Sequence, residues 1–97
     1  MIQSFADDGT EDLFNGRNSK AARRTLPRQL WQRTQNKLSL LDYAAELSDA
    51  GNVPGNRLES LKGSRRGQYS IRINDQCRIC FRWTDAGPED VEIVDYH

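Results

Sequence analysis

The stretch that decides the fold is residues 67–83, "GQYSIRINDQCRICFRW", in which apolar and polar side chains alternate. A period of two is typical of a half-buried β-strand, because successive side chains point to opposite faces. The pattern predicts two antiparallel strands, "GQYSIRIN" and "CRICFRW", joined at "NDQ". The face expected to be apolar comprises Tyr69, Ile71, Ile73, Cys77, Ile79, Phe81 and Trp83. The opposite face carries Ser70, Arg72, Asn74, Arg78, Cys80 and Arg82.

A further strand is expected in residues 91–97, "VEIVDYH", which alternate in the same way after the turn-rich "TDAGPED". Tyr96 falls on the arginine-bearing face of this sheet and His97 on the opposite face. His97 can therefore reach the arginines only if the last residue is ordered and bends toward Arg78. Shorter strands are expected at "MIQSF" and "RLESLK".

Residues 27–49 show the strongest helical periodicity in the chain. Spacings of three and four place on one stripe Leu30, Thr34, Leu38, Leu41 and Ala45. Thr25 is the expected N-cap, Pro27 fits the first turn, and Gly51 fits just past the end.

A second helix is expected in "DDGTEDLF", with Asp8 or Thr10 as the cap and Gly16 as the stop. The polar and basic "NGRNSKAARRT" that follows fits either a loop or a weak helix.

The chain has 97 residues and is expected to form one domain, residues 1–97. An apolar sheet face and an amphipathic helix must cover each other, which predicts an α+β fold. We expect a small antiparallel sheet with two or three helices packed on one face. The chain has no run of about 18 apolar residues and no signal-peptide pattern at its start, so a cytoplasmic protein is expected.

Cys77 and Cys80 form the CxxC spelling "CRIC". A redox pair needs a helix N-terminus to lower the thiol pKa, whereas side chains three positions apart on a strand face opposite ways. Two cysteines and a distant histidine also lack the ligand spacing of a structural zinc site. Structural cysteines are therefore favoured over metal ligands, and we expect neither a metal nor a cofactor.

Basic residues gather in two segments, although the formal net charge is zero. Residues 17–37 contain seven Lys or Arg and no acidic residue, and residues 57–82 contain seven more against Glu59 and Asp75. Arginine outnumbers lysine eleven to three, and its fork-shaped side chain suits phosphate. The pattern fits either a nucleic-acid surface or ordinary solvated faces. Arginines at neighbouring positions of the sheet should repel one another, which favours a polyanion lying across that face.

The side chains available there suit metal-independent RNA cleavage. Lysine and arginine can bind a phosphate, and Tyr96 and His97 can transfer protons. Asp95 and Glu59 add two carboxylates. In such a reaction the RNA 2′-hydroxyl attacks the adjacent phosphorus, so the protein supplies a base, an acid and cations. The same residues could also serve only to bind RNA.

Each of these residues also has a structural interpretation. A C-terminal histidine such as His97 is often a disordered surface residue, although the expected strand continues to Asp95. Tyr96 could pack on a neighbouring strand. Arg78 could be neutralised in an ion pair with Asp95 or Glu92. A DNA-binding repressor subunit is a further alternative, but the long expected helix is too sparsely basic to serve as a recognition helix.

The segment "GNRLESLKGSRRGQYSIRINDQCRICFRW" followed by "VEIVDYH" resembles the HigB toxins, the proteic-killer branch of the RelE superfamily. The match begins at "MIQSF" and is weakest in the basic segment 17–28, which looks longer than usual. This resemblance implies a small antiparallel sheet with two helices on one side. It also implies a ribosome-dependent endoribonuclease that cleaves mRNA in the ribosomal A site and halts growth. The implied partner is a HigA-type helix-turn-helix antitoxin, and operator DNA would be contacted only through that antitoxin.

The resemblance also implies roles for single residues. Asp95, Tyr96 and His97 fall on the family's functional C-terminal triplet. His97 would then be the general acid or base, with Tyr96 assisting and Asp95 orienting. Lys62 and Arg78 fall on phosphate-contacting positions, which completes the expected catalytic set. The expected RNA-binding residues are Arg65, Arg66, Arg72 and Arg82.

Two positions depart from the family pattern. Cys77 stands where tryptophan is common, and this change bears on packing because the residue belongs to the expected core face. Glu59 stands where some members have a histidine, and its part in proton transfer is left open. The alternative function is a non-catalytic RNA- or ribosome-binding module. The basic segment 17–37 could serve either rRNA docking or antitoxin contact.

Overall fold

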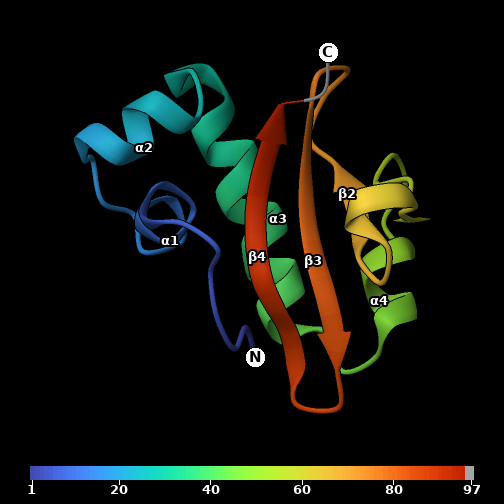
Figure 1. The fold of residues 1–97 in the computed structure, drawn as a ribbon. Helices are drawn as coiled ribbons and strands as arrows, with labels where there is room; N and C mark the ends of the chain where they lie inside the picture. The colour runs from blue at the N-terminus through green and yellow to red at the C-terminus, as the bar shows by residue number, and fades with distance from the viewer. Residues whose placement is uncertain (96–97) are drawn as a thin grey trace.

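A computed structural model describes residues 1–95, and Tyr96 and His97 lie outside the described residues. Four antiparallel strands form one sheet in the order β1-β2-β3-β4 (Figure 1). The strands are β1 Glu59–Ser60, β2 Tyr69–Arg72, β3 Cys77–Thr84 and β4 Gly87–Asp95. The predicted hairpin in residues 67–83 is confirmed as β2 and β3, with Arg72 directly opposite Arg78.

Helices cover one face of this sheet, with α3 running behind the strands (Figure 1). The α-helices are α1 Asp8–Phe14, α2 Lys20–Thr25, α3 Trp31–Tyr43 and α4 Leu47–Gly51. Short 3-10 turns stand at η1 Arg28–Leu30 and η2 Gly63–Arg65. The predicted α+β class with a small antiparallel sheet is confirmed. The described residues contain four α-helical segments rather than two or three.

The helix expected over residues 27–49 is wrong as a single element. Its first residues form η1, and α3 ends at Tyr43 because Ala44 is extended, with φ −61° and ψ 125°. The side chain of Asp49 then accepts hydrogen bonds from the backbone N–H groups of Ala45 and Glu46, which caps the start of α4. A capped start stabilises a new helix in a new direction.

The residues predicted to begin and end that helix also have other positions in the structure. Thr25 is the last residue of α2 rather than an N-cap, and Gly51 is the last residue of α4 rather than the residue beyond it. Ala45, the last member of the predicted stripe, is exposed, and Ala44 is buried in its place.

The N-terminal segment is extended, but "MIQSF" is not a regular strand. Within residues 1–95 it forms a single bridge, the parallel pair Phe5 and Val91, so it lies along the edge of β4. Asp7 caps α1, instead of Asp8 or Thr10, by accepting from the Thr10 backbone N–H at 2.7 Å. The buried Thr10 hydroxyl accepts from the Ile93 backbone N–H at 3.1 Å, so Thr10 ties α1 to β4.

The core lies between the helices and the apolar sheet face. Fully buried members from the helices are Leu13, Ala22, Leu38, Leu41 and Ala50. Fully buried members from the sheet are Ile71, Ile79, Phe81 and Val91. The period-two pattern therefore assigned the core face correctly, apart from the partly buried Tyr69 and Trp83.

Cys77 and Cys80 are both buried thiols. Burial, together with the nearby charge of Asp95, raises the pKa of the Cys77 thiol. A raised pKa keeps the thiol protonated and unreactive, which agrees with a structural role. Within residues 1–95 no group of three or more His, Cys, Asp or Glu could hold a metal ion. No helix in the same part of the chain is long and apolar enough to span a membrane.

Candidate active site

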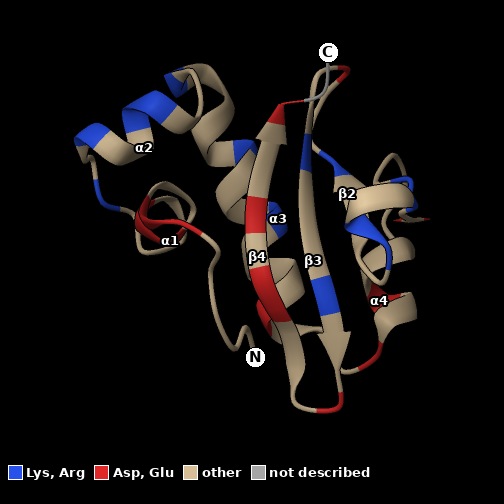
Figure 2. Cartoon of the chain, viewed as in Figure 1, with Lys and Arg blue, Asp and Glu red and all other residues tan. Residues whose placement is uncertain are grey.

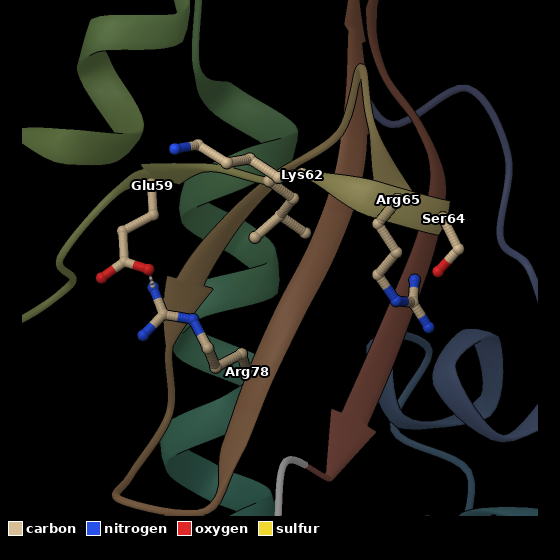
Figure 3. A pocket seen from close by; sticks show the side chains of 6 residues that line it. Glu59, Lys62, Ser64, Arg65 and Arg78 are labelled. Carbon is tan, nitrogen blue, oxygen red and sulfur yellow. Dashed lines mark ion pairs between the residues drawn. The ribbon is translucent and has the colours of Figure 1, made fainter.

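A pocket of about 550 Å³ opens on the sheet face that points away from α3 (Figure 3). It is lined by Glu59, Leu61, Lys62, Ser64, Arg65 and Arg78. These residues come from β1, from the segment that follows it, and from β3. Three of them, Lys62, Arg65 and Arg78, are site residues expected from the sequence.

Arg78 is the most firmly held of the cations. Its side chain is 14% exposed, and its Nε donates to the Ser70 hydroxyl at 2.7 Å. Its Nη2 donates to the backbone carbonyl of Arg57 at 2.6 Å and lies 4.0 Å from the Glu59 carboxylate. A guanidinium held on two sides is preorganised, so it can meet an anion with little loss of side-chain freedom.

The ion pair of Arg78 with Glu59 differs from the partners expected from the sequence. The structure pairs Glu92 with Arg65 instead, at 3.0 Å. Figure 3 shows the Glu59 carboxylate pointing toward the Arg78 guanidinium, a contact that runs from β1 across β2 to β3. A carboxylate and a guanidinium thus stand side by side at the mouth of one pocket. The available signal for Glu59 was its acidity within an otherwise basic segment.

The loop that presents the Arg57 carbonyl is anchored by a buried asparagine. Asn56 is fully buried; its side chain accepts a hydrogen bond from Lys37 of α3 and donates to the Ala50 carbonyl of α4 at 3.0 Å. Its own carbonyl accepts from the backbone N–H of Arg72 at 2.6 Å. Because Arg57 follows directly, the position of its carbonyl depends on these three bonds.

Replacing Asn56 by leucine is expected to lower the free energy of unfolding by about 1–3 kcal/mol, because the buried Ala50 carbonyl loses its donor. Chemical denaturation of the purified protein measures this change. Asn52→Leu, at an exposed residue just after α4, is the matched control and should stay within about 0.5 kcal/mol. Equal effects at the two positions would contradict the anchoring role.

Lys62 and Arg65 lie on the segment that folds back over β3 and β4. Lys62 is exposed and directly precedes η2. Arg65 donates to Gln68 at 3.1 Å and to Glu92 of β4 at 3.0 Å. Since Cys80 is fully buried on this side of β3 and lies opposite Glu92, the segment covers it. Lys62 therefore belongs to a segment that is tied to β4 through Arg65, and it lines the pocket.

The remaining expected RNA-binding arginines lie outside this pocket. Arg66 is exposed at the end of η2. Arg72 forms an ion pair with Asp75, and Arg82 forms one with Asp90 at 3.7 Å. Figure 2 shows the basic positions of β3 beside the acidic positions of β4. Acidic neighbours therefore offset part of the charge of the sheet arginines, which weakens the expected repulsion between them.

The last described residues of β4 lie close to Arg78 in the sheet register. Asp95 lies opposite Cys77, and Val94 lies opposite Arg78. Asp95 itself is exposed and is the last described residue. The roles predicted for Tyr96 and His97, and the predicted bend of His97 toward Arg78, lie outside the described residues.

A search of solved structures finds the same architecture in the YoeB-YefM complex from Staphylococcus aureus. The alignment covers 100% of this chain and 98% of that one, with a TM-score of 0.60 and 15% sequence identity. The chain thus shares its fold with that protein.

Sequence comparisons identify the family to which the chain belongs. A family model described as the RelE-like toxin of the type II toxin-antitoxin system HigB matches residues 3–97. Toxin HigB-1 of Vibrio cholerae serotype O1 is 42% identical over 86 residues, which cover 89% of this chain and 87% of that protein. Endoribonuclease HigB of Proteus vulgaris is 31% identical over 97 residues, the full length of both chains. The chain belongs to the HigB-like toxin family, and its partner is accordingly an antitoxin.

Proposed function

We propose that this endoribonuclease toxin cleaves translated mRNA in the ribosomal A site, without a metal, and thereby inhibits growth. The observation that carries the proposal is the pocket in which Glu59, Lys62 and Arg78 meet on the open face of the sheet. Membership of the HigB-like family supports it, since the relative from Proteus vulgaris is an endoribonuclease by name.

The reaction needs a base, an acid and positive charge. The base removes the proton of the RNA 2′-hydroxyl, whose oxygen attacks the adjacent phosphorus. The bond from phosphorus to the 5′-oxygen breaks, and the acid protonates that oxygen. The products are a 2′,3′-cyclic phosphate and a 5′-hydroxyl, so no water, metal or other reactant is consumed.

We assign these roles to residues that line the pocket and to the last three residues of the chain. Arg78 and Lys62 stabilise the negative charge that gathers on the phosphorane. The Glu59 carboxylate, 4.0 Å from Arg78, accepts the proton of the 2′-hydroxyl. His97 protonates the departing 5′-oxygen. Tyr96 assists, and Asp95 orients the terminal residues.

The surrounding cations bind the rest of the RNA chain. The residues proposed for this are Arg65, Arg66, Arg72 and Arg82. Where such an arginine has an acidic neighbour, an RNA phosphate replaces part of that ion pair. Because these contacts are electrostatic, RNA binding should weaken with rising salt concentration. The antitoxin is of the HigA helix-turn-helix type, operator DNA is contacted only through it, and the toxin acts in the cytoplasm.

The class of activity is tested by inducing the toxin with and without its antitoxin and mapping new mRNA 5′ ends. In-frame cuts that disappear when initiation of translation is blocked are the expected result. Growth arrest without new 5′ ends would instead favour an RNA- or ribosome-binding module. Cuts that persist in protein-free RNA would contradict dependence on the ribosome.

Replacing Arg78 by alanine is expected to raise the activation free energy of cleavage by about 1.5–3 kcal/mol, because a charge-assisted hydrogen bond to the phosphate is lost. The cleavage rate should then fall roughly 10- to 150-fold. Single-turnover cleavage on programmed ribosomes measures the rate, and a melting curve shows that the variant is folded. Arg23→Ala, at an exposed position of α2, is the matched control. An unchanged rate in folded Arg78→Ala would remove this residue from the site.

A further inference from the structure

A second pocket, of about 480 Å³, lies between α3 and the loop that follows α4. It is lined by Arg33, Asn36, Lys37, Leu40, Val53 and Asn56, and none of these lines the candidate active site. The catalytic roles assigned above therefore leave this pocket without a function.

The pocket carries positive charge without an acidic residue in its lining. Arg33 and Lys37 stand one turn apart on α3, and their recorded hydrogen-bond partners are neutral: the Ile73 carbonyl, at 3.3 Å from Arg33, and the Asn56 side chain. Burial, followed by the positive charges of Arg33 and Arg72, holds the pKa of Lys37 below its ordinary value. An anion placed here would relieve the repulsion between the cations.

Besides the two cations, the lining holds two neutral polar residues, Asn36 and Asn56, and two apolar residues, Leu40 and Val53. The apolar pair narrows the kind of anion that fits. Leu40 and Val53 contribute aliphatic side chains, and Val53 is 39% exposed. Tyr43, three residues beyond Leu40 on α3, is 86% exposed. Among residues 1–95 the only other exposed large hydrophobic residue is Met1. An RNA phosphate gains little from aliphatic groups, whereas a peptide with a carboxylate next to an apolar side chain contacts both kinds of surface.

We propose that this pocket docks a segment of the antitoxin, which places a carboxylate against Arg33 and Lys37 and an aliphatic side chain against Leu40 and Val53. The occupant follows from charge complementarity and from the exposed apolar side chains beside the two cations. The proposal depends on membership of a type II toxin-antitoxin family and not on the catalytic roles assigned above.

The test is calorimetric titration of purified antitoxin into toxin variants that keep their melting temperature. Arg33→Glu and Val53→Asp should each weaken the Kd at least tenfold, because one reverses the charge and the other places a carboxylate in the apolar part. Val53→Leu should keep the affinity within about twofold, since its side chain remains aliphatic.

The chain offers a matched control for the charge reversal. Arg23 is exposed on α2, does not line the pocket, and bonds only locally to Asn18. Arg23→Glu makes the same change in net charge and should shift the Kd less than twofold. An equal loss in Arg33→Glu and Arg23→Glu would reflect overall charge and would overturn the proposal.

Binding of the same variants to 70S ribosomes separates a peptide from RNA. The expected result is unchanged ribosome binding in Arg33→Glu and Val53→Asp. If Arg33→Glu binds ribosomes tenfold more weakly and the antitoxin normally, the pocket serves RNA and the proposal is wrong. It is equally wrong if neither partner is affected.

Discussion

His97→Ala is expected to cleave mRNA about 10²- to 10⁴-fold more slowly than the unmodified toxin while still binding ribosomes. The reason is that the departing 5′-oxygen loses its proton donor. A positioned acid or base typically accelerates a reaction by a factor of this size. Single-turnover cleavage on programmed ribosomes measures the rate, and cosedimentation measures binding. Deletion of the last residue should give the same loss.

A modified substrate distinguishes this role of His97 from a structural one. When sulfur replaces the 5′-bridging oxygen, the leaving group needs no protonation. The rate of His97→Ala on that substrate should then recover most of its deficit. Normal cleavage and growth arrest in both His97→Ala and the deletion variant would show that the proposed mechanism is wrong.

Glu59→Gln is expected to cleave mRNA about 10²-fold more slowly or worse, because the amide cannot accept the proton of the 2′-hydroxyl. Its rate on the sulfur-bridged substrate should stay low, since sulfur helps the leaving group and not the nucleophile. The two variants should therefore respond in opposite ways to one change in the RNA.

The structure provides a control for the charge removed with Glu59. Glu11 is exposed at the start of α1 and does not line the pocket, so Glu11→Gln should cleave at the normal rate. Loss of the ion pair with Arg78 should have little effect on stability, because Glu59 is exposed and surface pairs contribute less than about 1 kcal/mol. Full activity in Glu59→Gln would show that Glu59 is not the general base, and the base would then be Tyr96 or His97.

The sheet was predictable because its signal is local. Alternation in residues 67–83 places Ile71, Ile79 and Phe81 on one face, and all three are fully buried. The turn between β2 and β3 was visible in the same way, from turn-forming residues between the alternating runs. The predicted connection "TDAGPED" was too long, because β3 ends at Thr84 and β4 already begins at Gly87. Burial of one face also specifies register, because a slip by one residue would expose the whole set.

The helices were predicted less well, for a physical reason. The stripe from Leu30 to Leu41 is correct, but periodicity says nothing about where the backbone leaves the helix. Ala44 is buried in the extended conformation, and Asp49 caps a new helix after it. The contact of Asp49 with Ala45 and Glu46 is local, so Glu46 and Asp49 offered a capping signal in the sequence, whereas the burial of Ala44 depends on packing against the rest of the fold.

Arg78 and Lys62 were expected in the site, and Glu59 was named as an available carboxylate, but the ion-pair partners considered for Arg78 were Asp95 and Glu92 and not Glu59. Sequence order cannot reveal this contact, because it crosses β2 and needs the pairing of three strands. The second basic pocket is likewise hidden from sequence order, because its lining combines residues of α3 with Val53 and Asn56 from a later loop.

Local patterning was thus enough to specify the strand pairs, the core face and the basic character of the other face, because each depends on neighbouring residues. Folding in three dimensions alone specified which charges neutralise each other and which remain available. Arg72, Arg78 and Arg82 each lie beside a carboxylate, and Arg33 and Lys37 bond only to neutral groups in the described structure. Electrostatic energy depends on distances in space, which composition and spacing do not contain.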